Sequence, residues 1–346
     1  MRRSAANFGI HLLFGLAMFL IIWIAMNPGG ILKVPSFGTE GVQTFKTMFI
    51  SIFLEALPYL IIGVLVSAIL QVVVPEAWIR RFVPKNPILG IAFGCLLGIL
   101  FPLCECGMIP VVRRLIRKGM PLYVGVVFIL VGPIVNPIVF AATYTAFRIR
   151  PEMVYARMGL ALLVGLVIGL ILYAFVKSDP LKTTKEDLYR SEAAESGEGP
   201  EEESGTQAKG MGKLFAVMEQ AGGEIFDMGK YLIFGSVMTS LIQAFVPRAG
   251  MAEIGQQPIV SHLFMIGFAY VLSLCSTSDA FVASSFARTF SSGSLLTFLV
   301  FGPMLDFKST LMLLSVFKPR FVLLLAGLIT VTVLIGSLIL SHYALW

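Results

Sequence analysis

The chain has 346 residues, of which 57% are hydrophobic and only 13% are charged, and its mean hydropathy is +0.88. Soluble domains carry about 25% charged residues, so this composition excludes an ordinary soluble domain and indicates an integral membrane protein. The net charge of +6 comes from short basic clusters between apolar segments. Such clusters are typical of cytoplasmic loops, so we do not expect a nucleic-acid partner.

Apolar runs of about 20 residues recur along the chain, which predicts helices that span the lipid bilayer rather than a β-barrel. The first run covers residues 8–26, follows Arg2 and Arg3, and ends at Asn27-Pro28. No small-residue cleavage site follows it, so we expect a retained helix rather than a signal peptide. The second run covers residues 47–74 and ends before Pro75.

A polar cluster interrupts the third apolar run, at residues 88–118, where the chain reads Cys104-Glu105-Cys106-Gly107 and reaches Pro110. Polar groups at membrane depth are costly unless they face protein or water. We therefore expect an unwound turn that lines a cavity. Runs at 121–147 and 154–176 complete this part of the chain, and the first contains Asn136 within a second predicted break.

Residues 177–212 differ in kind, because they are rich in Glu, Ser and Gly and poor in large apolar side chains. Such a segment cannot bury enough surface to fold, so we predict a disordered acidic linker. Its expected role is a tether, and a regulatory or docking role is the alternative.

The sequence after the linker repeats the sequence before it. Tyr59 to Gly63 recurs as Tyr231 to Gly235, and Leu103-Cys104 recurs as Leu274-Cys275. Gly132-Pro133 and Asn136 likewise correspond to Gly302-Pro303 and Asp306. Internal repeats with broken helices at matching positions are typical of secondary transporters. We predict an N-terminal helix and loop (1–44), a first repeat (45–176), the linker (177–212) and a second repeat (213–346).

The predicted fold is an all-α integral membrane protein with about 8–9 transmembrane or re-entrant segments and helices broken at the midplane. Basic residues favour a cytoplasmic N-terminus, and a re-entrant hairpin with its tip at 104–107 keeps the basic residues on both sides of it inside. That arrangement makes the two halves inverted repeats. Parallel repeats with a full crossing at 88–118 are the alternative, because the hairpin leaves Arg148, Arg150 and Arg157 outside.

Three cysteines, Cys104, Cys106 and Cys275, lie in the two polar interruptions and are candidates for substrate binding. Three thiolates facing one cavity would suit a soft solute such as trivalent arsenic or a soft metal. The alternative is that each is a small buried hydrophobic residue, which is what we expect of Cys95. No histidine lies near these cysteines, so we predict neither a resident metal site nor a cofactor.

Three carboxylates also interrupt apolar sequence, namely Asp279, Glu105 and Asp306. A carboxyl group that faces a cavity can alternate between its charged and neutral forms, so we predict a role in proton coupling. The alternatives are a side chain that snorkels to the membrane interface and a pair with Lys308 or Arg288. Hydroxyl and amide groups add further candidates for substrate binding, and these are Ser276, Thr277, Ser278 and Asn136.

No enzyme signature is recognisable in the sequence. It contains no Walker A motif, and neither a Cys–His nor a Ser–Asp arrangement has a plausible base. We therefore do not expect an enzyme.

Three motifs together resemble the ArsP/YraQ-type predicted permeases: Cys104-Glu-Cys-Gly107 with Pro110, Gly132-Pro-Ile-Val-Asn136-Pro137, and Cys275-Ser-Thr-Ser-Asp279. The resemblance runs from about residue 45 to the C-terminus and implies a multi-pass permease of the plasma or inner membrane. Studied family members export trivalent organoarsenicals such as methylarsenite and confer arsenic resistance, using cysteines at the positions of Cys104, Cys106 and Cys275. Some relatives work with a separately encoded partner subunit.

Two hypotheses follow from the residues and the resemblance. The favoured one is a proton-coupled secondary transporter that exports a small thiol-reactive solute through a site lined by cysteines and carboxylates. The alternative is a membrane subunit of a permease complex that moves a metal ion, an anion or a lipid-linked solute, with structural cysteines. The lipid bilayer is a partner in both, and a homodimer is compatible with either.

Overall fold

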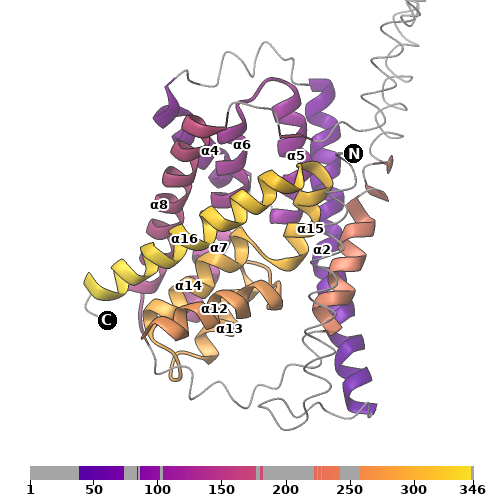
Figure 1. Ribbon diagram of the computed structural model, residues 1–346. Helices are drawn as coiled ribbons and strands as arrows, with labels where there is room; N and C mark the ends of the chain where they lie inside the picture. The colour runs from indigo at the N-terminus through magenta and orange to yellow at the C-terminus, as the bar shows by residue number, and fades with distance from the viewer. Residues whose placement is uncertain are drawn as a thin grey trace, which may run out of the picture.

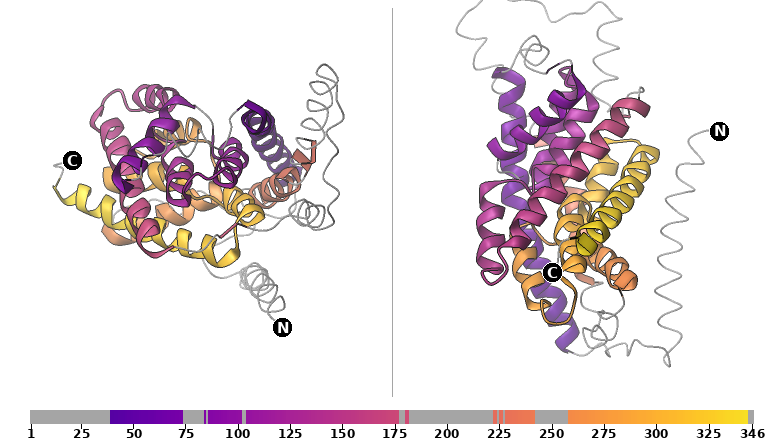
Figure 2. Two further views of the ribbon diagram at one scale, coloured as in Figure 1. Left: turned by 90° about the horizontal axis from the view of Figure 1, so that it is seen from above. Right: turned by 90° about the vertical axis from the view of Figure 1, so that its left-hand side faces the viewer.

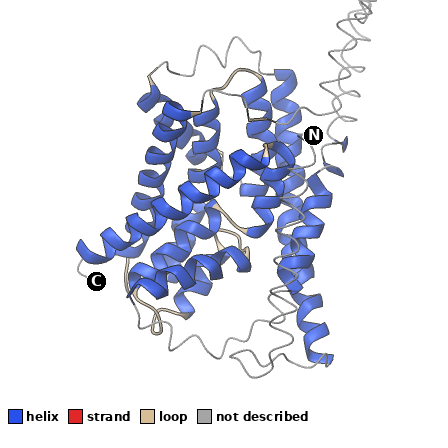
Figure 3. Cartoon of the chain, viewed as in Figure 1, coloured by secondary structure: helices blue, strands red, loops and turns tan. Residues whose placement is uncertain are grey.

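The computed structural model describes residues 39–73, 84, 86–101, 104–176, 180–181, 222–223, 225–226, 228–241 and 258–343. These residues form helices joined by loops (Figures 1 and 3), and their one bridge of strand type pairs Leu181 with Phe317. The predicted first span and nearly all of the predicted acidic linker lie outside them. The labelled helices are α2 (Thr39–Val73), α4 (Pro87–Leu100), α5 (Glu105–Arg117), α6 (Leu122–Val131), α7 (Pro137–Ala146), α8 (Glu152–Phe175), α12 (Pro258–Leu272), α13 (Ser278–Ser285), α14 (Ser292–Met304), α15 (Phe307–Val316) and α16 (Pro319–Tyr343).

The described residues include four apolar stretches long enough to cross a membrane: Gln43–Ile69, Glu152–Phe175, Ser292–Val316 and Pro319–His342. Further apolar helices are shorter than a full crossing. The prediction of an all-helical membrane protein is therefore confirmed for the part of the chain that the structure describes.

The short helices come in consecutive pairs. In each pair, a short non-helical break separates the first helix from the second. One break separates α4, which ends at Leu100, from α5, which begins at Glu105. The others fall at residues 132–136 between α6 and α7, 273–277 between α12 and α13, and 305–306 between α14 and α15. All four coincide with the polar or proline-containing interruptions that the sequence places in apolar surroundings. A helix of 13 residues such as α5 is about 20 Å long, which is less than the hydrocarbon thickness of about 30 Å.

Both halves of the molecule pack in the same order. In the first half, α4 and α5 pack on α6, and α6 packs on α8. In the second half, α12 and α13 pack on α14, and α14 packs on α16. Figure 1 shows α4 and α5 in the upper part of the molecule and α12 and α13 in the lower part, and the right-hand view of Figure 2 agrees.

The two halves meet through reciprocal contacts. Helix α5 of the first half packs on α15 of the second, and α13 of the second half packs on α7 of the first. The long helices α8 and α16 also pack on each other. Helices α6 and α14 are almost entirely buried and form the centre of the core. The broken segments are thereby held between the halves rather than at the edge of the molecule.

Candidate functional site

The break between α4 and α5 (hereafter the first break) places two thiols and a carboxylate at the start of α5. Cys104 is the N-cap residue with an extended backbone, and Glu105 and Cys106 lie in the first helical turn. Cys106 and Glu105 are buried, and the thiols of Cys104 and Cys106 are close enough to interact directly. The expected unwound turn at 104–107 is thus shorter than predicted, because α5 already begins at Glu105. A carboxylate in the first turn of a helix favours an early start, since it faces the positive end of the helix dipole.

The break between α12 and α13, at residues 273–277 (hereafter the second break), carries the remaining candidate thiol. Cys275 is half-buried between α12 and α13, and the hydroxyl of Thr277 lies 3.7 Å from its sulfur. Ser278 donates a hydrogen bond of 3.1 Å to Glu55 of α2. Asp279 lies in the first turn of α13 and is only 2% exposed, so it is a buried carboxylate.

The structure brings the two breaks together. The phenolic oxygen of Tyr59, on α2, lies within electrostatic range of Cys104, Cys275 and Glu55. Cys275 in turn interacts electrostatically with Glu105 of the opposite break. Thiols and carboxylates that are about 170 residues apart in the sequence therefore share one region between the halves.

Arg157 of α8 is the partner of Asp279. Its guanidinium group is completely buried and binds both carboxylate oxygens, at 3.0 and 2.7 Å. It also donates to the backbone oxygen of Ser276 at 3.1 Å and to the hydroxyl of Thr143 at 2.7 Å. From the sequence we expected Arg157 on the outer side of the membrane with Arg148 and Arg150, and we considered Lys308 and Arg288 as alternative partners for the three carboxylates. The structure gives Asp279 a different partner, Arg157, which is buried within α8.

A second charged cluster joins the first break to α15. The ammonium group of Lys308 lies 3.5 Å from Glu105 Oε1 and 4.0 Å from Asp306 Oδ2, and all three side chains are at most 5% exposed. Glu105 Oε2 and Asp306 Oδ2 are buried without a hydrogen-bond partner among the described residues. Two carboxylates thus share one cation, and this pairing with Lys308 is the alternative that the sequence analysis kept open.

Asn136 and Asp306 occupy corresponding positions in the two halves and have the same structural role. Asn136 is the N-cap of α7 and accepts a hydrogen bond of 2.8 Å from the backbone N–H of Val139. Asp306 is the N-cap of α15 and forms a capping box with Ser309. Both side chains satisfy backbone groups that a broken helix leaves unpaired. Capping uses much of the hydrogen-bonding capacity of the Asn136 side chain. From the sequence we predicted this residue as part of the substrate-binding site.

No group of three or more His, Cys, Asp or Glu side chains with the spacing of a metal site occurs within the described ranges. The four cysteines are all free. His262 is buried and contacts the hydroxyls of Thr297 and Ser337, at 2.7 and 3.2 Å. The three candidate thiols therefore do not form a closed metal centre in this conformation.

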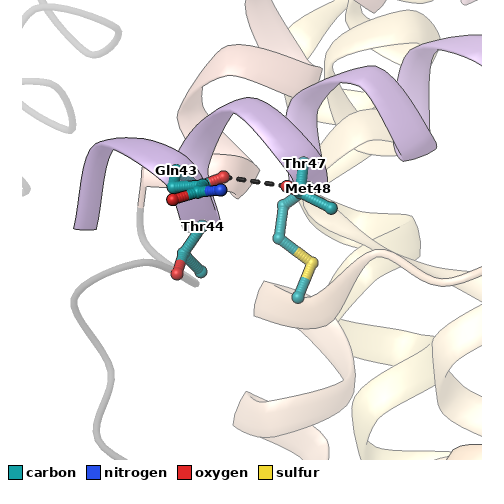
Figure 4. A pocket seen from close by; sticks show the side chains of 4 residues that line it. All are labelled: Gln43, Thr44, Thr47 and Met48. Atoms are coloured by element: carbon teal, nitrogen blue, oxygen red, sulfur yellow. Dashed lines mark hydrogen bonds between the residues drawn. The ribbon is translucent and has the colours of Figure 1, made fainter. Parts of the chain in front are cut away.

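Two surface cavities lie apart from the breaks. One, of about 470 Å³, is lined by Gln43, Thr44, Thr47 and Met48 at the start of α2 (Figure 4). Met48 is 11 residues from Tyr59, which corresponds to about 16 Å along a helix. The other, of about 700 Å³, is an almost entirely apolar groove between α8 and α16. Neither cavity includes a predicted site residue.

Broken helices with paired charges at their breaks, in a multi-pass helical membrane protein, are typical of the transporter class. Comparison with known proteins identifies the particular family. Residues 42–342 match the model of the ArsP_1 family, described as "predicted permease", and the chain belongs to this family.

Two curated relatives cover most of this chain. The "UPF0718 protein YcgR" of Bacillus subtilis (strain 168) is 47% identical over 297 residues, which are 86% of this chain and 96% of the relative. A protein of Streptococcus mutans named "Putative two-component membrane permease complex subunit" is 34% identical over 294 residues, which are 85% of this chain and 94% of the relative. No solved structure matches the chain significantly. The protein is accordingly a multi-pass membrane permease by family.

Proposed function

We propose that the chain is a proton-coupled secondary transporter that exports a small thiol-reactive solute, such as a trivalent organoarsenical, across the plasma membrane. The observation that carries the proposal is the meeting of the two broken segments, with Cys104, Cys106 and Cys275 beside buried carboxylates. Soft thiols suit a soft metalloid centre. Ser276, Thr277, Ser278 and Asn136 complete the proposed binding site.

The proposed mechanism uses inverted repeats, with boundaries at 45–176 and 213–346. Helices α4 and α5 are too short to cross a bilayer one at a time and lie at the same end of the molecule, whereas α12 and α13 lie at the opposite end (Figure 1). This arrangement supports two re-entrant hairpins that enter from opposite faces and meet near the midplane. The positive-inside rule then favours a cytoplasmic N-terminus.

An enzymatic function is not part of this proposal. The buried histidine, His262, contacts two hydroxyl groups on α14 and α16 rather than a cysteine. The guanidinium group beside Ser276 and Asp279 is a hydrogen-bond donor and cannot act as a general base. The breaks therefore carry groups suited to binding and proton exchange rather than to nucleophilic catalysis.

The first test replaces the thiols of the first break. We expect Cys104→Ser and Cys106→Ser each to abolish protection against methylarsenite in a sensitive host, because a hydroxyl is a poor ligand for a soft centre. The measurement is growth at graded methylarsenite concentrations, with Cys95→Ser as the matched control that keeps protection. Unchanged protection by both variants would remove thiol coordination from the mechanism.

The second test concerns coupling. We expect Asp279→Asn to stop methylarsenite flux driven by a pH gradient in proteoliposomes, because an amide in this place beside Arg157 can neither bind nor release the coupled proton. Glu105→Gln and Asp306→Asn, which keep the side-chain shapes, test the other two carboxylates in the same assay. Undiminished flux in a variant removes that carboxylate from the coupling mechanism.

The name of the Streptococcus mutans relative supports a second candidate function, that of one subunit in a two-component permease complex. A chain that needs a partner would not transport by itself. Protection against methylarsenite by this chain alone, expressed in a sensitive host, would contradict the obligate-subunit hypothesis. Protection that appears only when a second membrane protein is co-expressed would support it.

A further inference from the structure

Arg157 connects three segments that are far apart in the sequence. From its place on α8 it reaches α7 through the hydroxyl of Thr143, and it reaches the second break through Ser276 and Asp279. The Thr143 contact lies within the first half, whereas the other two contacts cross to the second half. A planar guanidinium group can serve several acceptors in one fixed geometry, which lysine cannot do.

The second break contains a backbone conformation that needs support. Ser273 has a φ of 46°, and it is the only residue other than glycine with a positive φ in the described part of the chain. This left-handed conformation is unfavourable for a residue with a Cβ atom and persists only where the surroundings hold it. The break also leaves backbone oxygens without helical partners, and Arg157 takes one of them, the oxygen of Ser276.

The first break is held in a different way. Among the described residues, Lys308 contacts it through the side chain of Glu105, at 3.5 Å, and shares its charge with Asp306. Two carboxylate oxygens remain without hydrogen-bond donors in that cluster. In contrast, both oxygens of Asp279 are bound by Arg157. The second break therefore has directional hydrogen bonds from a buried cation, and the first has a looser electrostatic contact.

We propose that Arg157 is a positioning residue that fixes the 273–277 break and thereby holds Cys275 in its place in the binding site. Arg157 thereby ties the second hairpin, which carries Cys275, to α7 and α8 of the first half. The relevance of this arrangement to transport rests on the proposed function, but the position of Cys275 can be measured without any transported solute.

The test compares alkylation rates of single cysteines in the reconstituted full-length chain. One background keeps only Cys275, a second keeps only Cys104, and serine replaces the other cysteines in each. We expect Arg157→Lys to raise the rate of N-ethylmaleimide reaction at Cys275 by about tenfold, because charged hydrogen bonds of this kind contribute at least that factor. The rate at Cys104 is expected to change by less than about twofold, within the effect of a distant substitution.

Arg150→Lys is the matched control. Arg150 also bridges the halves, through a hydrogen bond of 2.8 Å to Ser292, but it does not contact the second break. We expect it to leave Cys275 reactivity unchanged. Thr143→Val provides a milder second variant that removes one anchor of the guanidinium group and keeps the charge pair, and it is expected to raise the Cys275 rate by about threefold.

The outcomes separate this inference from the proposed function. A selective increase at Cys275 in Arg157→Lys, or in Thr143→Val if the lysine variant does not fold, supports the positioning role even if methylarsenite is not transported. An unchanged Cys275 rate in both variants overturns it. An equal increase at Cys104 and Cys275 also overturns it, because that result would mean a general loosening of the structure.

Discussion

Lys308→Met is expected to destabilise the protein by about 3–5 kcal/mol, which is the usual cost of removing one partner from a buried ion pair. Lys308 is the cation that Glu105 and Asp306 share, and all three side chains are at most 5% exposed. Methionine fills a similar volume but leaves two buried carboxylates without a compensating charge. The expected result is a lower midpoint of thermal unfolding in detergent, or loss of the monodisperse species in size-exclusion chromatography.

Two further variants test whether the loss of stability comes from the unpaired buried charges. Lys46→Met replaces an exposed lysine on α2, far along the chain from this cluster, and we expect a change within about 0.5 kcal/mol. Adding Glu105→Gln and Asp306→Asn to Lys308→Met removes all three charges together and is expected to restore most of the lost stability. If Lys308→Met were as stable as the parent chain, the cluster would not hold the first break to α15.

The positions of the helix breaks could be predicted because they depend on local sequence. Glycine, proline and polar residues stand out within apolar runs, and a membrane segment cannot leave backbone groups unpaired without protein or water nearby. Cys104, Asn136, Cys275 and Asp306 mark the four breaks, and the structure places each of them in a break or at its edge. The internal repeat also identified Asn136 and Asp306 as equivalent before their common capping role was visible.

The partners of the buried charges could not be predicted in the same way. Arg157 and Asp279 are 122 residues apart, and apolar periodicity does not reveal which helices pack together. From the positions of the basic residues we expected Arg157 on the outer side of the membrane with Arg148 and Arg150, but it lies within α8, which begins at Glu152, and it is completely buried. A usable signal was present in the sequence, since Arg157 is the only charged residue between Val154 and Val176. A single charge inside an apolar segment usually has a function.

The residue at which α5 starts could not be predicted either. The sequence analysis expected the whole stretch 104–107 to be unwound, because glycine and proline are frequent in breaks. The structure keeps Gly107 and Pro110 inside α5, and Pro110 lies only five residues after its first residue. Only the first four N–H groups of a helix lack a helical partner, so Pro110 lies beyond them and costs α5 one hydrogen bond, the one to the oxygen of Cys106, without ending the helix. Local composition therefore predicts approximately where a helix is interrupted, but not the residue at which the next helix begins.

Gly107→Ala is expected to displace the tip of the first hairpin, because α2 and α5 touch there through their backbones. A Cβ atom on Gly107 would lie 2.8 Å from the backbone oxygen of Tyr59, and a Cβ atom on Gly63 would overlap with the backbone of Gly107. Backbone atoms cannot move aside by changing a rotamer. We therefore expect a loss of about 1–3 kcal/mol from overpacking, together with loss of methylarsenite protection as Glu105 and Cys106 move away from Lys308 and Cys275.

Gly159→Ala is the matched control for this variant, because a Cβ atom at this position on α8 meets nothing within 4 Å. Alanine is favoured over glycine in a helix by about 0.5–1 kcal/mol, so this control is expected to be neutral or stabilising. The same preference applies to Gly107, which is also helical, but there the overpacking outweighs it, so we expect the two substitutions to change stability in opposite directions. Thermal unfolding of both variants, with Gly63→Ala as a second disruption of the same contact, measures that sign. Equal stabilisation by Gly107→Ala and Gly159→Ala would show that α2 does not set the position of the Cys104–Glu105–Cys106 turn.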